Sequence, residues 1–349
     1  MTVVVWRDER REGEKEAQRT DLRRLAPPLN PSLSEPPPQT IRAALAEDAG
    51  DAGDLTTAST IPAGTPATAT FTAKAAGVVA GLGVADAVFR AVDPSITPTW
   101  LTADGQAVTA GTLLGTATGP AASLLIAERV ALNFMQRMGG IASAAAAMVA
   151  AVRAGSPPGA PPCTLLDTRK TAPGLRLLDK WGVLIGGGAN HRLGLYDMVM
   201  VKDNHAAAAG GVGPAAAAAR AFLLAAGRPA TPIEVEARTL AEVAEVLAIV
   251  AADPSGCGIT RLMLDNMVSV DGSGVVDTSL LAEAVALVRA CKAAAGLETE
   301  ASGGVTLASA GAIAGTGVSH VSCGAITHSS PALDISMGLR LGGEKKEGV

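Results

Sequence analysis

Aromatic residues are scarce in this chain, which contains three Trp, one Tyr and four Phe among 349 residues. Hydrophobic residues nevertheless make up 48% of the sequence, so Ala, Val and Leu must fill most of the core. A chain of this length folds into about two domains on average. The composition therefore predicts a mainly aliphatic core divided between about two domains.

Cysteine is scarce as well, and the four cysteines lie far apart, at positions 163, 257, 291 and 323. Metal-binding clusters and disulfide-rich folds need cysteines at short, regular spacings, which this sequence lacks. Reduced thiols are typical of cytosolic proteins. We therefore expect free cysteines and a cytoplasmic location.

Two further features are missing, a long uncharged apolar segment and an excess of positive charge. No apolar run reaches the roughly 18 uncharged residues that a membrane-spanning helix needs. The net charge is −5, whereas a protein that binds nucleic acid needs a basic surface. The sequence thus predicts neither a membrane nor a nucleic acid as partner, and any anion site must be built from local cations.

Residues 1–38 differ in composition from the rest of the chain. Between Arg7 and Arg24 there are seven Lys or Arg residues and six Asp or Glu residues, and a Pro-rich stretch follows. Mixed charge with much proline is typical of disorder. The stretch lacks the apolar core of a secretory signal and is too acidic for an organelle transit peptide. We therefore expect a disordered extension outside the fold.

Residues 39–148 mix short helical and extended patterns, separated by Asp-Gly and Ala-Gly turns. Such a mixture predicts a small α+β domain of the open-sandwich type, joined to the rest of the chain by a long helix. The expected elements are helices at 40–50 and 82–92, strands at 67–81 and 97–120, and the connecting helix at 121–155.

Residues 149–330 alternate regularly between short apolar strands and alanine-rich helices. Strict alternation with buried strands predicts a parallel sheet. Six such units suit an incomplete TIM-like (β/α) barrel, with residues 331–349 as a C-terminal segment. A doubly wound open sheet is the alternative, although no G-x-G-x-x-G follows the first strand.

Polar residues gather at the C-terminal end of each expected strand. In parallel barrels these ends meet at one rim, where active sites are built. Ordinary solvated strand caps are the alternative, but six polar strand ends in register favour a functional rim. The candidate residues at these ends are Arg169, Lys170, Lys202, Glu236, Asp265, Ser302, Gly303, Gly304, Gly324 and His328.

The expected rim contains several cations, which would repel one another unless a multiply anionic ligand binds among them. Arginine can bind carboxylates in a bidentate manner, and lysine supplies a point charge suited to phosphates. The cations are Arg169, Lys170, His191, Arg192 and Lys202.

Carboxylates and glycines complete this rim. Glu236 and Asp265 suit either Mg²⁺ ligation or stabilisation of a developing positive charge. The turn 302–304, Ser-Gly-Gly, precedes a helix and can offer backbone N–H groups to a phosphate, and Gly324 on the next strand lets the backbone approach. Barrels often bind a phosphate at these late strands.

Seven motifs occur in order between Thr40 and Met337: ALAEDAGDAGDLTT, AERVALNFMQRMGGIAS, DTRKTAPGLRLLDKWGVLIGGGANHRLGLYDMVMVKDNH, IEVEA, MLDNM, EASGGV and CGAITHSSPALDISM. With these motifs the chain closely resembles the quinolinate phosphoribosyltransferase family, also called nicotinate-nucleotide pyrophosphorylase (carboxylating). The stretches 255–260 and 268–277 depart from the family pattern as local insertions and remove no rim residue.

The resemblance implies a reaction: phosphoribose passes from phosphoribosyl pyrophosphate to quinolinate, giving nicotinate mononucleotide, pyrophosphate and CO2 in NAD synthesis. By motif position, Arg169, His191, Arg192 and Lys202 would hold the quinolinate carboxylates, and Lys170 would lie beside the pyrophosphate. Glu236 and Asp265 would act at the ribose and bind Mg²⁺, and Ser302, Gly303, Gly304, Gly324 and His328 would bind the 5′-phosphate.

The resemblance also implies a homodimer or a larger oligomer. In the family, the helix that carries Arg129 reaches into the site of the neighbouring subunit. Arg129, Asn133 and Gln136 share one helical face. An ordinary exposed polar face is the alternative interpretation.

Three other functions stay open on the sequence alone. A related phosphoribosyltransferase acting on nicotinate or another ring acid would need fewer cations, because nicotinate has one carboxylate. A barrel aldolase would use Lys202 to form a Schiff base. A non-catalytic barrel would only bind phosphorylated metabolites.

Overall fold

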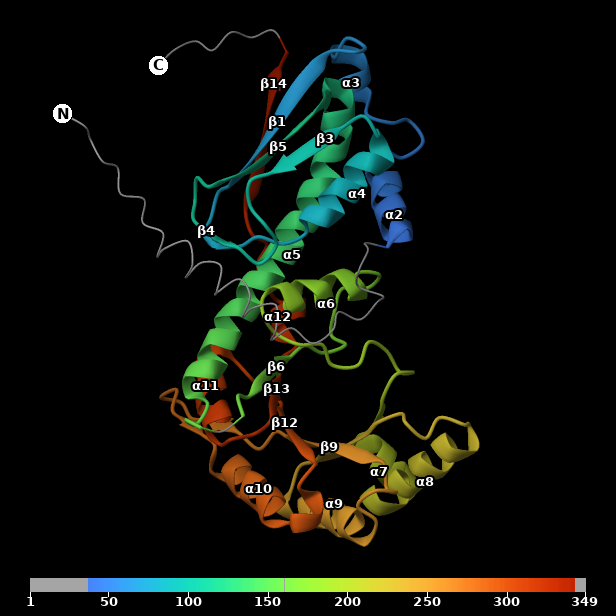
Figure 1. Ribbon diagram of the computed structural model, residues 1–349, viewed down its shortest axis with the longest axis vertical. Coiled ribbons are helices and arrows are strands. Elements are labelled where there is room, and N and C mark those ends of the chain that lie inside the picture. The colour runs from blue at the N-terminus through green and yellow to red at the C-terminus, as the bar shows by residue number, and fades with distance from the viewer. Residues whose placement is uncertain (1–36, 160, 343–349) are drawn as a thin grey trace, which may run out of the picture. The chain divides into compact units, whose positions relative to one another are not determined.

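The computed structural model describes residues 37–159 and 161–342 (Figure 1). The predicted disordered extension, residues 1–38, lies almost entirely outside this part of the chain, as does the end of the predicted C-terminal segment. All described residues belong to a single packed unit.

An antiparallel sheet of four strands lies in the N-terminal half of the fold, next to a smaller two-stranded pair. Its strands are β1 (Pro66–Ala73), β3 (Thr97–Trp100), β5 (Leu113–Pro120) and β14 (Ile335–Leu341), and the pair is β2 (Gly77–Val78) with β4 (Ala107–Val108). The order of the large sheet is β14-β1-β5-β3. Phe71 is fully buried and contacts Phe89 and Trp100, with ring centroids 6.0 and 5.3 Å apart. Alternation along β1 thus places one face of the sheet on the core.

Strand β14 comes from the C-terminal end of the described chain. It pairs antiparallel with β1, so that Met337 lies opposite Phe71. The predicted C-terminal segment therefore returns to the N-terminal sheet after the barrel is complete.

Three helices pack near this sheet: α2 (Pro38–Ala49), α3 (Leu55–Thr60) and α4 (Leu82–Val92). The expected helix at 82–92 is confirmed, and its buried face carries Val84, Val88 and Phe89. Helix α3 was not expected; it begins where the Asp54 carboxylate accepts a hydrogen bond from the Thr57 N–H, at 2.9 Å. Such an N-cap stabilises a short helix that has little periodicity.

The connecting helix α5 (Ala121–Gly155) has the predicted bounds. It contributes Leu124 and Met135 to the core of the N-terminal half and Ile141 and Met148 to the core of the barrel. By length and composition it could span a membrane, but half of its most apolar window is buried inside the protein. A helix that serves two cores must be apolar on several faces, which explains this composition.

The C-terminal half contains the six predicted strands in one parallel sheet. They are β6 (Thr164–Leu166), β7 (Val199–Val201), β8 (Ile233–Ala237), β9 (Ile259–Asp265), β12 (Glu298–Ser302) and β13 (His320–Ser322), and their order is β6-β13-β12-β9-β8-β7. The first strand pairs with the last, as in a barrel and unlike a doubly wound sheet. Strands β6 and β7 are the two ends of this sheet, and β6 instead forms an isolated bridge from Leu166 to Ala189, in the segment between α6 and β7. The predicted fold class, an incomplete TIM-like barrel behind an α+β domain, is confirmed.

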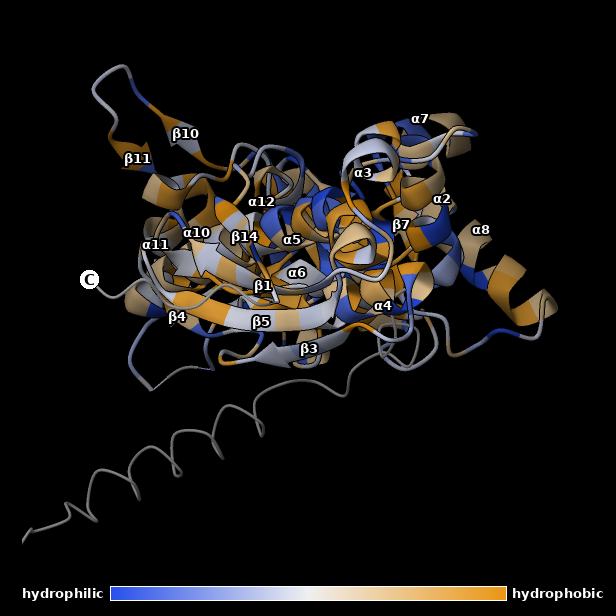
Figure 2. Ribbon diagram, turned by 90° about the horizontal axis from the view of Figure 1, so that it is seen from above, coloured by the Kyte–Doolittle hydropathy of each residue, from blue (hydrophilic) through white to orange (hydrophobic). Residues whose placement is uncertain are grey.

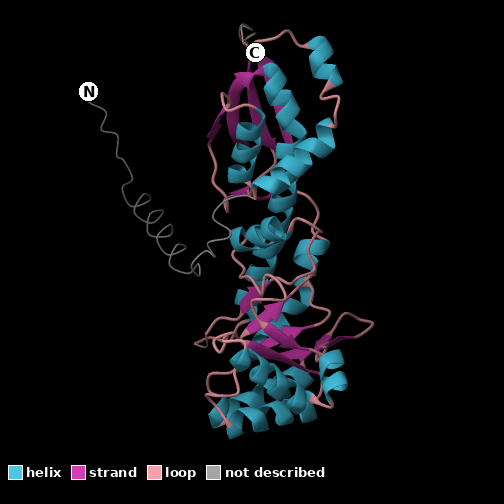
Figure 3. Ribbon diagram, turned by 90° about the vertical axis from the view of Figure 1, so that its right-hand side faces the viewer, coloured by secondary structure: helices cyan, strands magenta, loops and turns pink. Residues whose placement is uncertain are grey.

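Helices alternate with these strands. They are α6 (Arg176–Ile185), α7 (Asp203–Ala209), α8 (Val212–Ala225), α9 (Leu240–Ala252), α10 (Ser279–Ala290), the 3₁₀ helix η2 (Lys292–Ala294), α11 (Leu307–Gly315) and α12 (Ala325–His328). Helices α8 and α9 pack on strands of this sheet and α10 packs on α9. Figure 3 shows a layer of helices beside the strands of this half. The predicted insertion at 268–277 forms a hairpin of β10 (Ser269–Val270) and β11 (Val276–Asp277), which extends away from the fold (Figure 2).

Candidate active site

A cavity of about 720 Å³, called here the rim cavity, lies at the carboxyl ends of the parallel strands. Among the predicted site residues, only Arg129 is not part of its lining; that side chain is exposed on α5. The predicted residues that line the cavity are Arg169, Lys170, His191, Arg192, Lys202, Glu236, Asp265, Ser302, Gly303, Gly304, Gly324 and His328.

The loop after β6 forms one wall of the rim cavity. Lys170 lies against Gly324, because a Cβ atom at position 324 would come within 2.8 Å of the Lys170 Cδ. The Thr327 hydroxyl donates a hydrogen bond to the Lys170 carbonyl at 2.9 Å, which ties this loop to α12. Both Arg169 and Lys170 are exposed, so their charged ends are accessible to a ligand.

Arg192 stands half-buried on the next part of the wall. Its Nη1 donates to the Met198 carbonyl at 3.1 Å, which holds the guanidinium in place. Burial lowers the pKa of Arg192, and the nearby Arg169 charge lowers it further. The two cations therefore repel each other, and an anionic ligand between them would relieve that repulsion.

A buried ion pair beneath this wall fixes the segment 190–192. Asp167 and Lys180 are both fully buried and form an ion pair. The Asp167 carboxylate accepts from the His191 N–H at 2.9 Å, and the Lys180 ammonium donates to the His191 carbonyl at 2.9 Å. Sequence reasoning missed Asp167, although its place directly before Thr168 and Arg169 was a signal.

His191 connects the rim to a second buried charge cluster. Its Nε2 lies 2.9 Å from Glu234 Oε2 and 3.3 Å from Glu300 Oε2, and both carboxylates are fully buried. Burial disfavours the protonated ring, but interaction with Glu234 and Glu300 outweighs it and raises the pKa of His191 to about 9. The three ligand atoms lie within 4.8 Å of one another, a spacing that a metal ion could also use. The Nε2 of His191 is thus directed at these buried carboxylates, while its Nδ1 accepts from the Arg192 N–H at 2.6 Å.

The opposite wall carries the carboxylates. Glu236, which is nearly buried, accepts from the Lys202 ammonium at 2.9 Å. Arg238, which sequence reasoning missed, lies beside Glu236, Asp265 and Asp203. Arg238 lies one residue beyond the end of β8, and no local pattern in the sequence singled it out.

The late strand ends approach one another closely. Asn266 adopts a left-handed conformation (φ 57°), and its N–H donates to the Ser302 carbonyl at 2.9 Å. Gly303 (φ 92°) packs so tightly that a Cβ atom there would lie 2.2 Å from the Asn266 Oδ1. Gly304 (φ 61°) follows in the same conformation. The turn is therefore pinned by Asn266 and exposes its backbone to the cavity.

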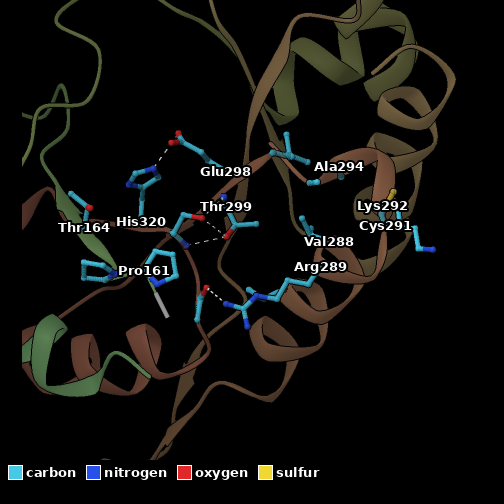
Figure 4. Close-up of a pocket in the computed structure, with 16 residues that line it drawn as sticks. Pro161, Thr164, Val288, Arg289, Cys291, Lys292, Ala294, Glu298, Thr299 and His320 are labelled. Atoms are coloured by element: carbon cyan, nitrogen blue, oxygen red, sulfur yellow. Dashed lines mark hydrogen bonds and ion pairs between the residues drawn. The ribbon is translucent and has the colours of Figure 1, made fainter. Parts of the chain in front are cut away.

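A second cavity, of about 710 Å³, lies at the amino ends of the strands. His320 and Glu298 face each other there, with Nε2 and Oε2 3.1 Å apart, as Figure 4 shows. Arg261 pairs with Glu298 at 3.0 Å and with Glu300 at 3.2 Å. These ion pairs form a chain of charges through the barrel interior from this cavity to His191 at the rim.

Two family descriptions match the chain. "Quinolinate phosphoribosyl transferase, N-terminal domain" matches residues 54–139, and "Quinolinate phosphoribosyl transferase, C-terminal domain" matches residues 141–338. The chain belongs to the quinolinate phosphoribosyltransferase family.

Named members of this family are similar over most of the chain. The chloroplastic nicotinate-nucleotide pyrophosphorylase (carboxylating) of Oryza sativa subsp. japonica is 49% identical over 90% of this chain and 80% of that protein. The mitochondrial quinolinate phosphoribosyltransferase (decarboxylating) 2a of Nicotiana tabacum is 46% identical over 91% of this chain and 86% of that protein. The crystal structure of NadC from Streptococcus pyogenes is 37% identical, with a TM-score of 0.74, and covers 87% of this chain and 96% of that chain.

The predicted cytoplasmic location is wrong, because the plant relatives just described are chloroplastic or mitochondrial. All four cysteines are free, as expected. Free thiols occur in organelles as well as in the cytosol, so the scattered cysteines could not establish a cytosolic protein.

Proposed function

We propose that this protein transfers phosphoribose from phosphoribosyl pyrophosphate to quinolinate, releasing pyrophosphate and CO2 and forming nicotinate mononucleotide. The observation that carries this proposal is the rim cavity itself, in which cations, carboxylates and two glycine-containing strand ends face one space. Together with the family membership, this arrangement matches a site for two polyanions.

The phosphoribosyl donor would bind along the late strands. The pinned turn of Ser302, Gly303 and Gly304 offers backbone N–H groups to the 5′-phosphate, and His328 and Gly324 lie in the same cavity. The packing of Lys170 against Gly324 supports a position for this ammonium beside the pyrophosphate.

Quinolinate would bind on the cationic wall. The nearby charge of Arg169 contributes to lowering the pKa of Arg192, so a dicarboxylate would bind favourably between these two guanidinium groups. His191 and Lys202 would complete the set that holds the two carboxylates.

The ring nitrogen of quinolinate would attack the anomeric carbon as the bond to pyrophosphate breaks, and the leaving pyrophosphate would take the bonding electrons. Glu236 and Asp265 would stabilise the positive charge that develops on the ribose. The alkylated ring nitrogen then stabilises the electron pair left on the ring carbon when CO2 departs, and that carbon takes up a proton. Positioning and charge would supply most of the catalysis.

Mg²⁺ would be held by Glu236 and Asp265. Their carboxylates fit such a cation, since they already gather around the positively charged Arg238. Bound Mg²⁺ would neutralise charge on the donor's pyrophosphate. We further propose a homodimer or larger oligomer in which Arg129 enters the neighbouring site; exposure of Arg129 and Asn133 on one helical face supports it.

We also propose an organellar location, which the chloroplastic and mitochondrial relatives support. Fusing a fluorescent protein to the C-terminus of the full chain and comparing its distribution with organelle markers would test this. Diffuse cytosolic fluorescence would contradict it.

The decisive assay incubates the protein with phosphoribosyl pyrophosphate, Mg²⁺ and quinolinate labelled in the carboxylate at ring position 2. We expect labelled CO2 and nicotinate mononucleotide in equal amounts. Product from nicotinate, with none from quinolinate, would overturn the proposal in favour of a related enzyme for ring monoacids.

A further inference from the structure

The guanidinium of Arg238 contacts three carboxylates that come from three different segments. Its Nη1 lies 2.8 Å from Asp203 Oδ2, at the start of α7. Its Nη2 lies 3.3 Å from Glu236 Oε1, in β8, and its Nε lies 3.4 Å from Asp265 Oδ2, at the end of β9. One side chain therefore joins the ends of three neighbouring strands.

Two of these carboxylates are the groups proposed to bind Mg²⁺. Both oxygens of Glu236 are already paired, Oε1 with Arg238 and Oε2 with Lys202. The Oδ2 atom of Asp265 is shared between Arg238 and the Asn266 amide, which donates to it at 2.7 Å. A divalent cation bound directly by these carboxylates would use the same oxygens, so Arg238 and the cation compete for the same atoms.

The side chains of Glu236 and Arg238 differ in how far they are exposed to solvent. The side chain of Glu236 is only 3% exposed and is fixed within the strand, whereas that of Arg238 is 46% exposed. The Arg238 guanidinium can therefore move away from the carboxylates by rotation of its long side chain toward the cavity, without a change in the backbone. A negatively charged group that enters the cavity would give the guanidinium an alternative partner.

We propose that Arg238 occupies the carboxylate site of the free protein as an internal cation and gives it up to a divalent cation when the donor's diphosphate binds. This inference rests on the proposed function for the identity of the donor. In this exchange the guanidinium moves from the carboxylates to the diphosphate while the divalent cation takes its place, so each anionic group keeps a cationic partner. The free protein then binds divalent cations weakly, and metal and donor bind together.

The test measures Mn²⁺ binding by electron paramagnetic resonance, first to the free protein. Arg238→Gln removes the competing cation, so we expect Mn²⁺ to bind at least about fivefold more tightly than to the wild type. Arg153→Gln is the matched control, because it removes one exposed positive charge on α5, outside the cavity lining. Equal or weaker Mn²⁺ binding by Arg238→Gln would overturn the proposal, as would equal tightening in the control.

A second measurement adds phosphoribosyl pyrophosphate without quinolinate. We expect the donor to tighten Mn²⁺ binding more in the wild type than in Arg238→Gln, because the variant has no guanidinium for the donor to draw away from the carboxylates. An identical effect of the donor in both proteins would contradict the exchange. Glu236→Gln in the Arg238→Gln background should remove the gain in affinity; its persistence would place the Mn²⁺ elsewhere and refute the site.

Failure of the proposed function would look different. If the wild type shows no turnover of quinolinate but Arg238→Gln still binds Mn²⁺ more tightly, the competition between Arg238 and the cation is supported and the proposed reaction is contradicted. A thermal melt of each variant shows that the binding differences come from folded protein.

Discussion

The side chain of Lys170 passes directly across Gly324, so that a single methyl group at position 324 would collide with the Lys170 Cδ at 2.8 Å. The loop after the first barrel strand, β6, therefore packs against the residue that follows the last barrel strand, β13. A substitution at position 324 would disturb this contact and can therefore test it.

Gly324→Ala should displace the Lys170 ammonium and weaken the binding of phosphoribosyl pyrophosphate. We expect the KM for phosphoribosyl pyrophosphate to rise roughly ten- to hundredfold, since the loss of one charged contact costs about 1.5–3 kcal/mol, while the KM for quinolinate changes little. Steady-state kinetics with each substrate varied in turn would measure this. Gly338→Ala is the control, because a Cβ atom at position 338 meets nothing within 4 Å. Equal changes in both KM values would contradict the expected selectivity.

Gly303→Ala should destabilise the fold as well as the phosphate turn. It combines a strained φ of 92° with a clash of 2.2 Å against Asn266 Oδ1, so we expect a loss of about 2–4 kcal/mol in the free energy of unfolding. Gly304→Ala has a φ of 61° but no atom within 4 Å, and should lose only about 1 kcal/mol. Urea denaturation of both variants measures the difference, and equal losses would show that Asn266 does not pin the turn.

The buried pair of Asp167 and Lys180 predicts a strong asymmetry between single and double variants. Lys180→Met leaves the Asp167 carboxylate buried without its cation and should cost about 3–5 kcal/mol in the free energy of unfolding. Adding Asp167→Asn should recover part of that loss. Lys292→Met, at an exposed position, serves as the control. If the double variant is no more stable than Lys180→Met, the pair is not the source of the effect.

His191 predicts a dependence of stability on pH. Its pKa is raised to about 9 in the folded protein, against about 6.5 in the unfolded chain. The stabilisation is therefore complete below pH 6.5 and is lost as the pH rises through about 9, by up to roughly 3 kcal/mol. Urea denaturation between pH 6 and pH 9.5 measures the slope. His191→Asn should abolish this slope and His205→Asn should retain it; a wild type with constant stability over this range would refute the raised pKa.

Arg129 predicts complementation between inactive subunits. If the proposed shared site is correct, Arg129→Ala and Lys170→Ala should each reduce turnover strongly, because each would remove a cation from it. Mixing the two unfolded variants and refolding them together should restore about a quarter of wild-type activity, since half the dimers then carry one intact site. Refolding each variant alone is the control. No recovery in the mixture would mean that Arg129 acts outside the neighbouring site.

Much of the rim could be predicted from the sequence for a simple geometric reason. Strict alternation of strands and helices requires a parallel sheet, and a parallel sheet brings all carboxyl ends to one edge. Residues such as Lys202, Glu236 and Asp265 were therefore placed together without knowledge of any contact between them.

Other relationships depend on pairings between segments that no local pattern encodes. Arg238 looks like an exposed residue after a strand, and only the fold brings Asp203 and Asp265 to it. Lys180 and Asp167 are 13 residues apart, and their burial follows from how α6 packs. Strand β14 reads as an ordinary tail because its partner β1 lies more than two hundred residues earlier.

That last pairing has a consequence for the order of synthesis. The edge of the N-terminal sheet is filled by β14, with Leu341 opposite Ala67, and this strand is translated after every strand of the barrel. During translation, the edge of β1 that pairs with β14 therefore stays unpaired until the whole barrel has been synthesised. An open edge invites wrong pairing, so β1 is exposed to such pairing during translation until β14 has been made.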